Sequence, residues 1–316
     1  MRRPNRELSA VIIACLLICF AAAAQDLTLF RADTRLVVLH TTVVDRDDKL
    51  VTNLPQKAFR VFESGVEQQI KIFKREDVPV SLGLVIDNSG SIRDKRQKVE
   101  AASLQLVKAS NPQDQVFIVN FNDEAYLDVP FTNETAKLEE GVARIDSRGG
   151  TAMRDAIAMS IDYMRSDGKL DKKIILVVTD GNDNMSSISL EQLVQKAQQA
   201  EVLIYAVGLL NEEDRGEAKK AKRALDAITT ASGGLPYYPE AVSDIAEIAL
   251  QVAHEIRNQY TLAYTPSNAS LDGSYRQIKV SVSGPNRPVA RTRTGYYATA
   301  EPRDKPRAFQ TPAADR

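Results

Sequence analysis

Three short segments, far apart in the chain, carry oxygen side chains of the kind that bind a hard metal ion. Asp87, Ser89 and Ser91 come directly after the apolar run 81–86. Thr151 follows a pair of glycines, and Asp180 lies just beyond a second apolar run, 173–178. Carboxylates and hydroxyls on loops at the ends of buried strands can bind such a cation without breaking the hydrogen bonds of the sheet. We therefore predict that these side chains form a single divalent-metal site.

The same residues, in this order, resemble the metal-ion-dependent adhesion site of the von Willebrand factor type A domain family, which reads Asp-x-Ser-x-Ser, Thr and Asp. The resemblance implies that Ser89 and Ser91 ligate the ion directly through their hydroxyls, and that Thr151 does so when a partner is bound. It also implies that Asp87 and Asp180 act largely through water or orient the direct ligands. In this family the site is usually a binding device and rarely the active site of an enzyme.

The donor set indicates which cation to expect. Two carboxylates and neutral hydroxyls suit a small, hard ion in octahedral coordination with retained waters, so we expect Mg²⁺, with Mn²⁺ or Ca²⁺ as alternatives. Each segment by itself has an ordinary structural explanation, because Ser89 or Ser91 could cap the helix that begins near Ile92, and residues 179–181 could form a turn. The three segments in combination, each after a suitable element, favour the metal site.

Asp94 lies where integrin β-subunits place a ligand for a second, adjacent metal ion. The next acidic residue of that second site is missing, because Lys95 occupies its place. An aspartate in the first turn of a helix also interacts favourably with the helix dipole, and we prefer that explanation.

The region 78–258 alternates between strand and helix patterns, which predicts an α/β fold with a doubly wound, mostly parallel sheet. Buried strands are expected at 82–86, 115–121, 173–179 and 202–207, with an edge hairpin partner at 125–129 and a short edge strand at 236–238. Helices are expected at 92–110, 134–145, 153–165, 190–200, 212–231 and 242–257.

Strand patterns flank this region on both sides, at 34–44, 58–62 and 67–73 before it and at 259–264, 275–282 and 289–293 after it. Three strands are too few to bury a sheet face alone, so we expect the two flanks to pair into a small β-sandwich into which the α/β domain is inserted. The flanking segments 43–54, 58–65, 260–266 and 293–297 also resemble a bacterial group described as von Willebrand factor A domain-related. The expected organisation is N-terminal strands at 25–77, an A-type domain at 78–258, C-terminal strands at 259–298 and a disordered tail at 299–316.

Residues 1–24 differ in composition from the rest of the chain. Three arginines within the first six residues precede an almost wholly apolar stretch at 8–20, and four alanines end at Ala24. This pattern predicts a secretory signal peptide cleaved near Ala24–Gln25. Two alternatives stay open: an uncleaved membrane anchor through residues 8–24, since about 17 apolar residues nearly suffice to span a bilayer, and lipidation at Cys15. Each of them places the remainder outside the cytoplasm, in the periplasm or the extracellular space.

Charge and motif content exclude several functional classes. The net charge is −1 with basic and acidic residues interspersed, so we expect no nucleic-acid partner. Both cysteines, Cys15 and Cys19, lie in the signal segment, so a cleaved chain would have no disulfide. His40 and His254 are the only histidines, and neither a Gly-x-Ser-x-Gly elbow nor a phosphate-binding loop is present. We therefore do not expect an enzyme.

The most economical function is that of an exported, bacterial protein that binds a protein partner. An Asp or Glu carboxylate of the partner would complete the coordination of the metal, and the rim residues Asn122, Arg148, Arg154 and Asn182 would supply specificity. One alternative is a structural scaffold of an envelope complex, in which the metal serves stability alone. A less favoured alternative is a metal-dependent hydrolase, with Asp123 or Asp183 as the conceivable bases.

Overall fold

The computed structural model describes residues 36–299, except residues 76, 110, 144–146, 182 and 211–214. The chain divides into a unit of residues 1–34 and a unit of residues 35–316, so every described residue belongs to the second unit. The predicted signal peptide, 1–24, and the predicted tail from residue 300 onward lie outside the described residues. None of the helices in the described residues is long and apolar enough to cross a membrane.

A mostly parallel sheet forms the centre of the region between residues 80 and 257. In the described residues its strands lie in the order β10-β9-β8-β5-β6-β7, and β7 at one edge runs antiparallel to β6. The strands are β5 (Val80–Asp87), β6 (Gln115–Phe121), β7 (Ala125–Thr132), β8 (Lys172–Thr179), β9 (Leu203–Gly208) and β10 (Pro236–Tyr237). Every residue of β5 is buried, as in a strand that is covered on both faces. This order confirms the predicted doubly wound, mostly parallel sheet.

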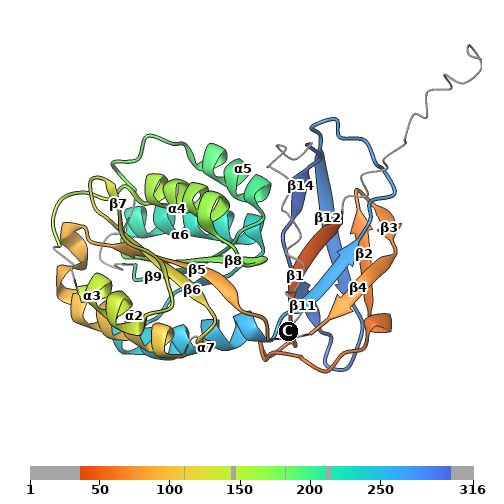
Figure 1. The fold of residues 1–316 in the computed structure, drawn as a ribbon, viewed down its shortest axis with the longest axis horizontal. Helices are drawn as coiled ribbons and strands as arrows, with labels where there is room; N and C mark the ends of the chain where they lie inside the picture. The colour runs from red at the N-terminus through yellow and green to blue at the C-terminus, as the bar shows by residue number, and fades with distance from the viewer. Residues whose placement is uncertain are drawn as a thin grey trace, which may run out of the picture. The chain divides into compact units, whose positions relative to one another are not determined.

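Helices cover both faces of this sheet (Figure 1). The helices α2 (Arg96–Ala109), α3 (Thr135–Ala143) and α7 (Ile245–Arg257) share one apolar core with the sheet. The helices α4 (Met153–Asp167), α5 (Leu190–Ala200) and α6 (Arg215–Ser232) share another core on the opposite face. A 3-10 helix, η2 (Gly90–Lys95), leads from β5 into α2.

The strand order reverses at β5, and in α/β sheets such a switch point is where a crevice is expected beyond the carboxyl ends of the strands. Strand β5 lies between β6 and β8, and the chain passes first to β6 on one side and later to β8 on the other. Where connections diverge in this way, the loops at the carboxyl ends of the strands separate and leave space for a ligand. The predicted metal ligands lie on the loops around this point.

The flanking strands form antiparallel sheets that mix the two ends of the chain. In the described residues the orders are β13-β1-β11-β4 and β14-β12-β2-β3. The strands are β1 (Val37–Val44), β2 (Phe59–Glu63), β3 (Val66–Gln68), β4 (Ile70–Lys74), β11 (Tyr260–Tyr264), β12 (Tyr275–Val282), β13 (Val289–Arg291) and β14 (Gly295–Tyr297). Residues from both sheets, such as Leu39, Val61 and Leu262, share one apolar core. The flanks therefore pair with each other, as the predicted sandwich requires.

The predicted number of strands in each flank was wrong. The predicted strand at 67–73 is divided at Gln69 into β3 and β4, which join different sheets. Gln68 turns inward and is 5 % exposed, with its amide hydrogen-bonded to Ser267. The chain thus crosses from one sheet to the other at this point, and each flank contributes four strands within the described residues instead of three.

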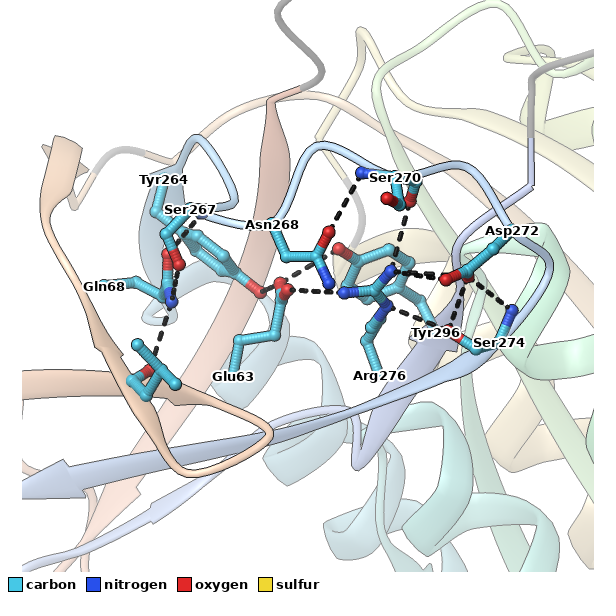
Figure 2. Close-up of polar contacts among 11 residues, drawn as sticks. Glu63, Gln68, Tyr264, Ser267, Asn268, Ser270, Asp272, Ser274, Arg276 and Tyr296 are labelled. Atoms are coloured by element: carbon cyan, nitrogen blue, oxygen red, sulfur yellow. Dashed lines mark hydrogen bonds and ion pairs between the residues drawn. The ribbon is translucent and has the colours of Figure 1, made fainter.

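A buried carboxylate organises one end of this sandwich (Figure 2). Glu63 is 3 % exposed, and its Oε2 accepts hydrogen bonds from the hydroxyls of Tyr264, at 2.7 Å, and Tyr296, at 2.9 Å. Arg276 Nη1 lies 4.0 Å from Glu63 Oε1, and Arg276 Nη2 donates to the carbonyl of Ser270. A buried charge of this kind is tolerated because it is paired and hydrogen-bonded. The tyrosines at 264 and 296 therefore belong to the interior of the sandwich.

We expect His40 to make the stability of this fold sensitive to acid. Burial, with the nearby positive charges of Lys172 and Arg293, lowers its pKa from 6.5 to about 3. Because the folded pKa lies below the unfolded one, the unfolded chain binds more protons in this interval. The contribution of neutral His40 to the free energy of unfolding is therefore fully present above pH 6.5 and is lost as the pH falls toward 3.

We predict that His40→Gln reduces the loss of stability between pH 7 and pH 5 by roughly 2 kcal/mol, since one titrating group accounts for about 1.4 kcal/mol per pH unit. The measurement is the free energy of unfolding in urea at both pH values. His254→Gln, which changes an exposed histidine on α7, is the matched control and should behave like the unchanged chain. If the His40→Gln variant lost as much stability between pH 7 and pH 5 as the unchanged chain, His40 would not be the source of the acid sensitivity.

Candidate metal site

The loops after β5 and β8 bring two carboxylates to the same edge of the central sheet. In the parallel register Ile86 lies opposite Val178. Asp87 is the last residue of β5, and Asp180 follows the last residue of β8. They are 1 % and 6 % exposed, respectively. The pairing of the strands thus places both acids at the crevice.

The hydroxyl side chains lie among these carboxylates. Ser91 Oγ donates to Asp180 Oδ1 at 2.8 Å and lies 3.1 Å from Ser89 Oγ. A Cβ atom built on Gly181 would lie 3.9 Å from both Ser91 Oγ and Thr151 Oγ1. Hydroxyls from two different loops therefore face the small space beside Gly181, which a larger residue at that position would enter.

Both oxygens of Asp87 are engaged within the chain. Oδ1 accepts from the backbone N–H of Ser89 at 2.8 Å, and Oδ2 accepts from Thr179 Oγ1 at 2.6 Å. Burial raises the pKa of the Asp87 carboxyl to about 6, while the hydrogen bonds from Ser89 and Thr179 act in the opposite direction. Asp87 thereby fixes the loop that carries Ser89, which agrees with the orienting role that the resemblance implies.

The oxygens of Asp180 are also both engaged. Oδ1 accepts from Ser91, and Oδ2 lies 3.1 Å from Lys95 Nζ. Lys95 Nζ in addition donates to the backbone carbonyl of Leu209 at 2.9 Å. This ion pair could not be predicted from the amino-acid sequence, because the two residues are 85 positions apart.

Hydrogen bonds from several directions hold the loop that carries Thr151. Gly90 N–H donates to the carbonyl of Gly149, and the N–H of Arg148 donates to the carbonyl of Asn88. From other loops, Asp123 Oδ1 accepts from the N–H of Gly150 at 2.7 Å, and Asn184 Oδ1 accepts from the N–H of Thr151 at 2.9 Å. Thr151 itself is 4 % exposed. Asp123 and Asn184 are thus positioning residues. Sequence reasoning considered Asp123 only as a conceivable base and did not assign Asn184 to the site.

Comparison with known proteins identifies the family that has this arrangement. The family model described as the von Willebrand factor type A domain matches residues 82–257, more than half of the chain. This protein belongs to the von Willebrand factor type A domain family. The matched range contains all five candidate ligands, from Asp87 to Asp180. A comparison with curated protein sequences gave no match.

Several solved structures are similar in fold to this A-type protein. The vWF domain of the type V pili tip protein Mfa5 from Porphyromonas gingivalis is 14% identical over 57% of this chain and 95% of that one, with a TM-score of 0.48. A von Willebrand factor type A protein from Catenulispora acidiphila is 13% identical over 83% of this chain and 73% of that one, with a TM-score of 0.48. Proximal thread matrix protein 1 from the mussel byssus, with a zinc-occupied MIDAS motif, is 16% identical over 62% of this chain and 50% of that one, with a TM-score of 0.49.

The donor set of this A-type domain fits a hard divalent cation. All five side chains offer oxygen, which suits Mg²⁺, Mn²⁺ or Ca²⁺ better than the softer metals that prefer imidazole or thiolate. In the described residues no group of three or more His, Cys, Asp or Glu side chains lies together as a metal cluster. The hydroxyls of Ser89, Ser91 and Thr151 supply three of the five candidate oxygen ligands.

The predicted rim residues have different surroundings. Arg148 is exposed, and the backbone carbonyl of Asn122 accepts from the N–H of Ala152 at 2.7 Å. Arg154 is engaged within the chain, because its Nη2 lies 3.1 Å from Asp183 Oδ1 and its N–H donates to Asp183 Oδ2 at 2.6 Å. Asn182 lies outside the described residues.

The Thr151 loop depends on a glycine at position 149. Gly149 has a φ of +77°, and a Cβ there would lie 2.2 Å from Asp123 Oδ2. Gly65 also has a positive φ, +85°, but a Cβ there would meet nothing within 4 Å. Gly65→Ala therefore measures the backbone strain alone, about 1–2 kcal/mol.

We predict that Gly149→Ala destabilises the protein by about 1–3 kcal/mol more than Gly65→Ala, because it also displaces the Asp123 carboxylate from the N–H of Gly150. The measurement is the free energy of unfolding in urea. In an Asp123→Ala background the cost of Gly149→Ala should fall toward that of Gly65→Ala. Equal costs at the two glycines in the unchanged chain would contradict this account of the loop.

Proposed function

We propose that this protein is an exported adhesion module that captures a protein partner through a divalent cation, with Mg²⁺ as the expected ion. Ser89, Ser91 and Thr151 would hold the cation through their hydroxyls, while Asp87 and Asp180 orient these ligands. When bound, the cation supplies an electrophilic position for a carboxylate of the partner, from Asp or Glu. The loops that surround the crevice would then select among acidic partners.

The engagement of both carboxylates within the chain carries this proposal. Asp87 binds the Ser89 N–H and the Thr179 hydroxyl, and Asp180 binds Ser91 and Lys95. These contacts within the protein offset part of the negative charge of the two carboxylates. The neutral hydroxyls would then be the groups that bind the ion directly. A cation held mainly by neutral ligands attracts an external carboxylate more strongly than one that is surrounded by anions.

The same geometry argues against a hydrolase. Asp123 and Asp183 are the acids near the site that sequence reasoning could nominate as bases. The Asp123 carboxylate accepts from Gly150 N–H, and the Asp183 carboxylate accepts from Arg154 and Ser186. Their hydrogen bonds hold loops in place, which gives both acids a structural role that does not require catalysis.

The proposal of export depends on residues 1–24, whose composition is that of a signal peptide. A periplasmic or extracellular location follows from cleavage, and anchoring in a membrane follows if residues 8–24 are retained. In either case the A-type domain would face partners outside the cytoplasm. The alternative of an envelope scaffold with a purely structural metal is decided by whether partner binding requires the ion.

We predict that Asp180→Ala abolishes metal-dependent capture of a partner while the fold survives, because it removes the acceptor of Ser91 and weakens metal affinity by about 10- to 100-fold. The measurement is affinity capture from the envelope fraction of the source organism in Mg²⁺ and in EDTA, with thermal unfolding as a check of the fold. Asp94→Ala, which changes an exposed aspartate on η2, is the matched control and should capture normally.

Partners that are retained by the unchanged chain in Mg²⁺ only, and lost with Asp180→Ala, would support adhesion through the metal. Recovery of the same partners in EDTA and with Asp180→Ala would refute it, and would assign the metal to stability and binding to another surface.

A further inference from the structure

Lys95 places a positive charge at the edge of the candidate metal site. It ends η2, the same 3-10 helix that carries Ser91. Its Nζ lies 3.1 Å from Asp180 Oδ2, and the side chains of Lys95 and Asp180 are 23 % and 2 % exposed. A second hydrogen bond, to the carbonyl of Leu209 at 2.9 Å, fixes the ammonium group in this position.

This contact divides the two oxygens of Asp180 between different partners. Oδ1 faces Ser91, on the side of the other hydroxyls, while Oδ2 is held by Lys95. Asp180 therefore cannot turn both oxygens toward one ion unless its ion pair with Lys95 breaks. Asp87 is restricted in the same way by Ser89 and Thr179.

The restriction affects divalent cations differently. Ca²⁺ takes six to eight oxygen ligands and commonly uses a carboxylate in bidentate fashion, whereas Mg²⁺ requires a small octahedral shell and retains several waters. A site whose carboxylates can each offer at most one oxygen therefore suits Mg²⁺ better than Ca²⁺. The ammonium charge also offsets part of the negative charge and so weakens the attraction of any divalent ion.

We propose that Lys95 sets the cation selectivity of the site, by holding Oδ2 of Asp180 and thereby disfavouring Ca²⁺ relative to Mg²⁺ and Mn²⁺. The inference rests on the proposed function, since it assumes a divalent ion among Ser89, Ser91 and Thr151. It adds a residue that lies outside the family's five-residue pattern and assigns it a specific effect. A purely structural role, in which Lys95 only ties η2 to the carbonyl of Leu209, would leave the ratio of cation affinities unchanged.

The test is calorimetric titration of the full chain with MgCl₂, MnCl₂ and CaCl₂, supported by thermal unfolding in each salt. Lys95→Met removes the charge and the hydrogen bonds but keeps an apolar stem of similar length. We expect it to raise Ca²⁺ affinity on the order of tenfold and Mg²⁺ affinity by clearly less, so that the ratio of the two shifts toward Ca²⁺. Lys98→Met, at an exposed position in α2, should change neither affinity.

Lys95→Gln is a second variant, in case Lys95→Met does not fold. Its amide can still donate to the Leu209 carbonyl, and it should shift the ratio of Ca²⁺ to Mg²⁺ affinity in the same direction. If the unchanged chain binds cations and the ratio stays the same in both Lys95 variants, the role of Lys95 is refuted while the metal site stands. If the unchanged chain binds none of the three cations, the proposed metal site is refuted, and this inference with it.

Discussion

The parallel pairing of β5 with β8 is the contact on which the candidate site depends. It aligns Ile86 with Val178, so that Asp87 and Asp180 leave the sheet at the same edge. Among the described residues, the chain between them includes two further strands, three α-helices and the 3-10 helix η2. The pairing is buried under helices on both faces, and β5 has no exposed residue. Because this core fixes the strand ends, the loops beyond them can be used for ligands at little cost to the fold.

Hydrogen bonds of polar side chains join the loops around the candidate site. Asp87, Asp123, Asp183 and Asn184 all accept hydrogen bonds from backbone N–H groups of neighbouring loops or of their own. The acids near the site thus act mainly in positioning, and in the proposed function the hydroxyls of Ser89, Ser91 and Thr151 are the groups that would bind the cation. Such an arrangement suits recognition through coordination, in which selectivity comes from the rigidity of the surrounding shell.

The fold class and the five candidate ligands could be predicted because each ligand follows a strong local signal, an apolar run or a pair of glycines. Lys95 and Thr179 could not be assigned to the site, since their contacts with Asp180 and Asp87 join parts of the chain 85 and 92 positions apart. The division of residues 67–73 into two strands was also missed. The segment contains no glycine or proline that would mark a break, and the crossing at Gln69 depends on which sheet each half joins. Arg154 looked available for a partner, but its pairing with Asp183 is a tertiary contact.

The central claim is that one divalent cation lies among the hydroxyls of Ser89, Ser91 and Thr151. The most direct test is a crystal structure of the protein grown with Mn²⁺ in place of Mg²⁺, with anomalous diffraction recorded at the manganese edge. The account predicts an anomalous peak about 2.1–2.2 Å from Ser89 Oγ and Ser91 Oγ, with Asp180 Oδ2 still bound to Lys95. Absence of a peak at this position, or a manganese ion held directly by both oxygens of Asp180, would contradict it.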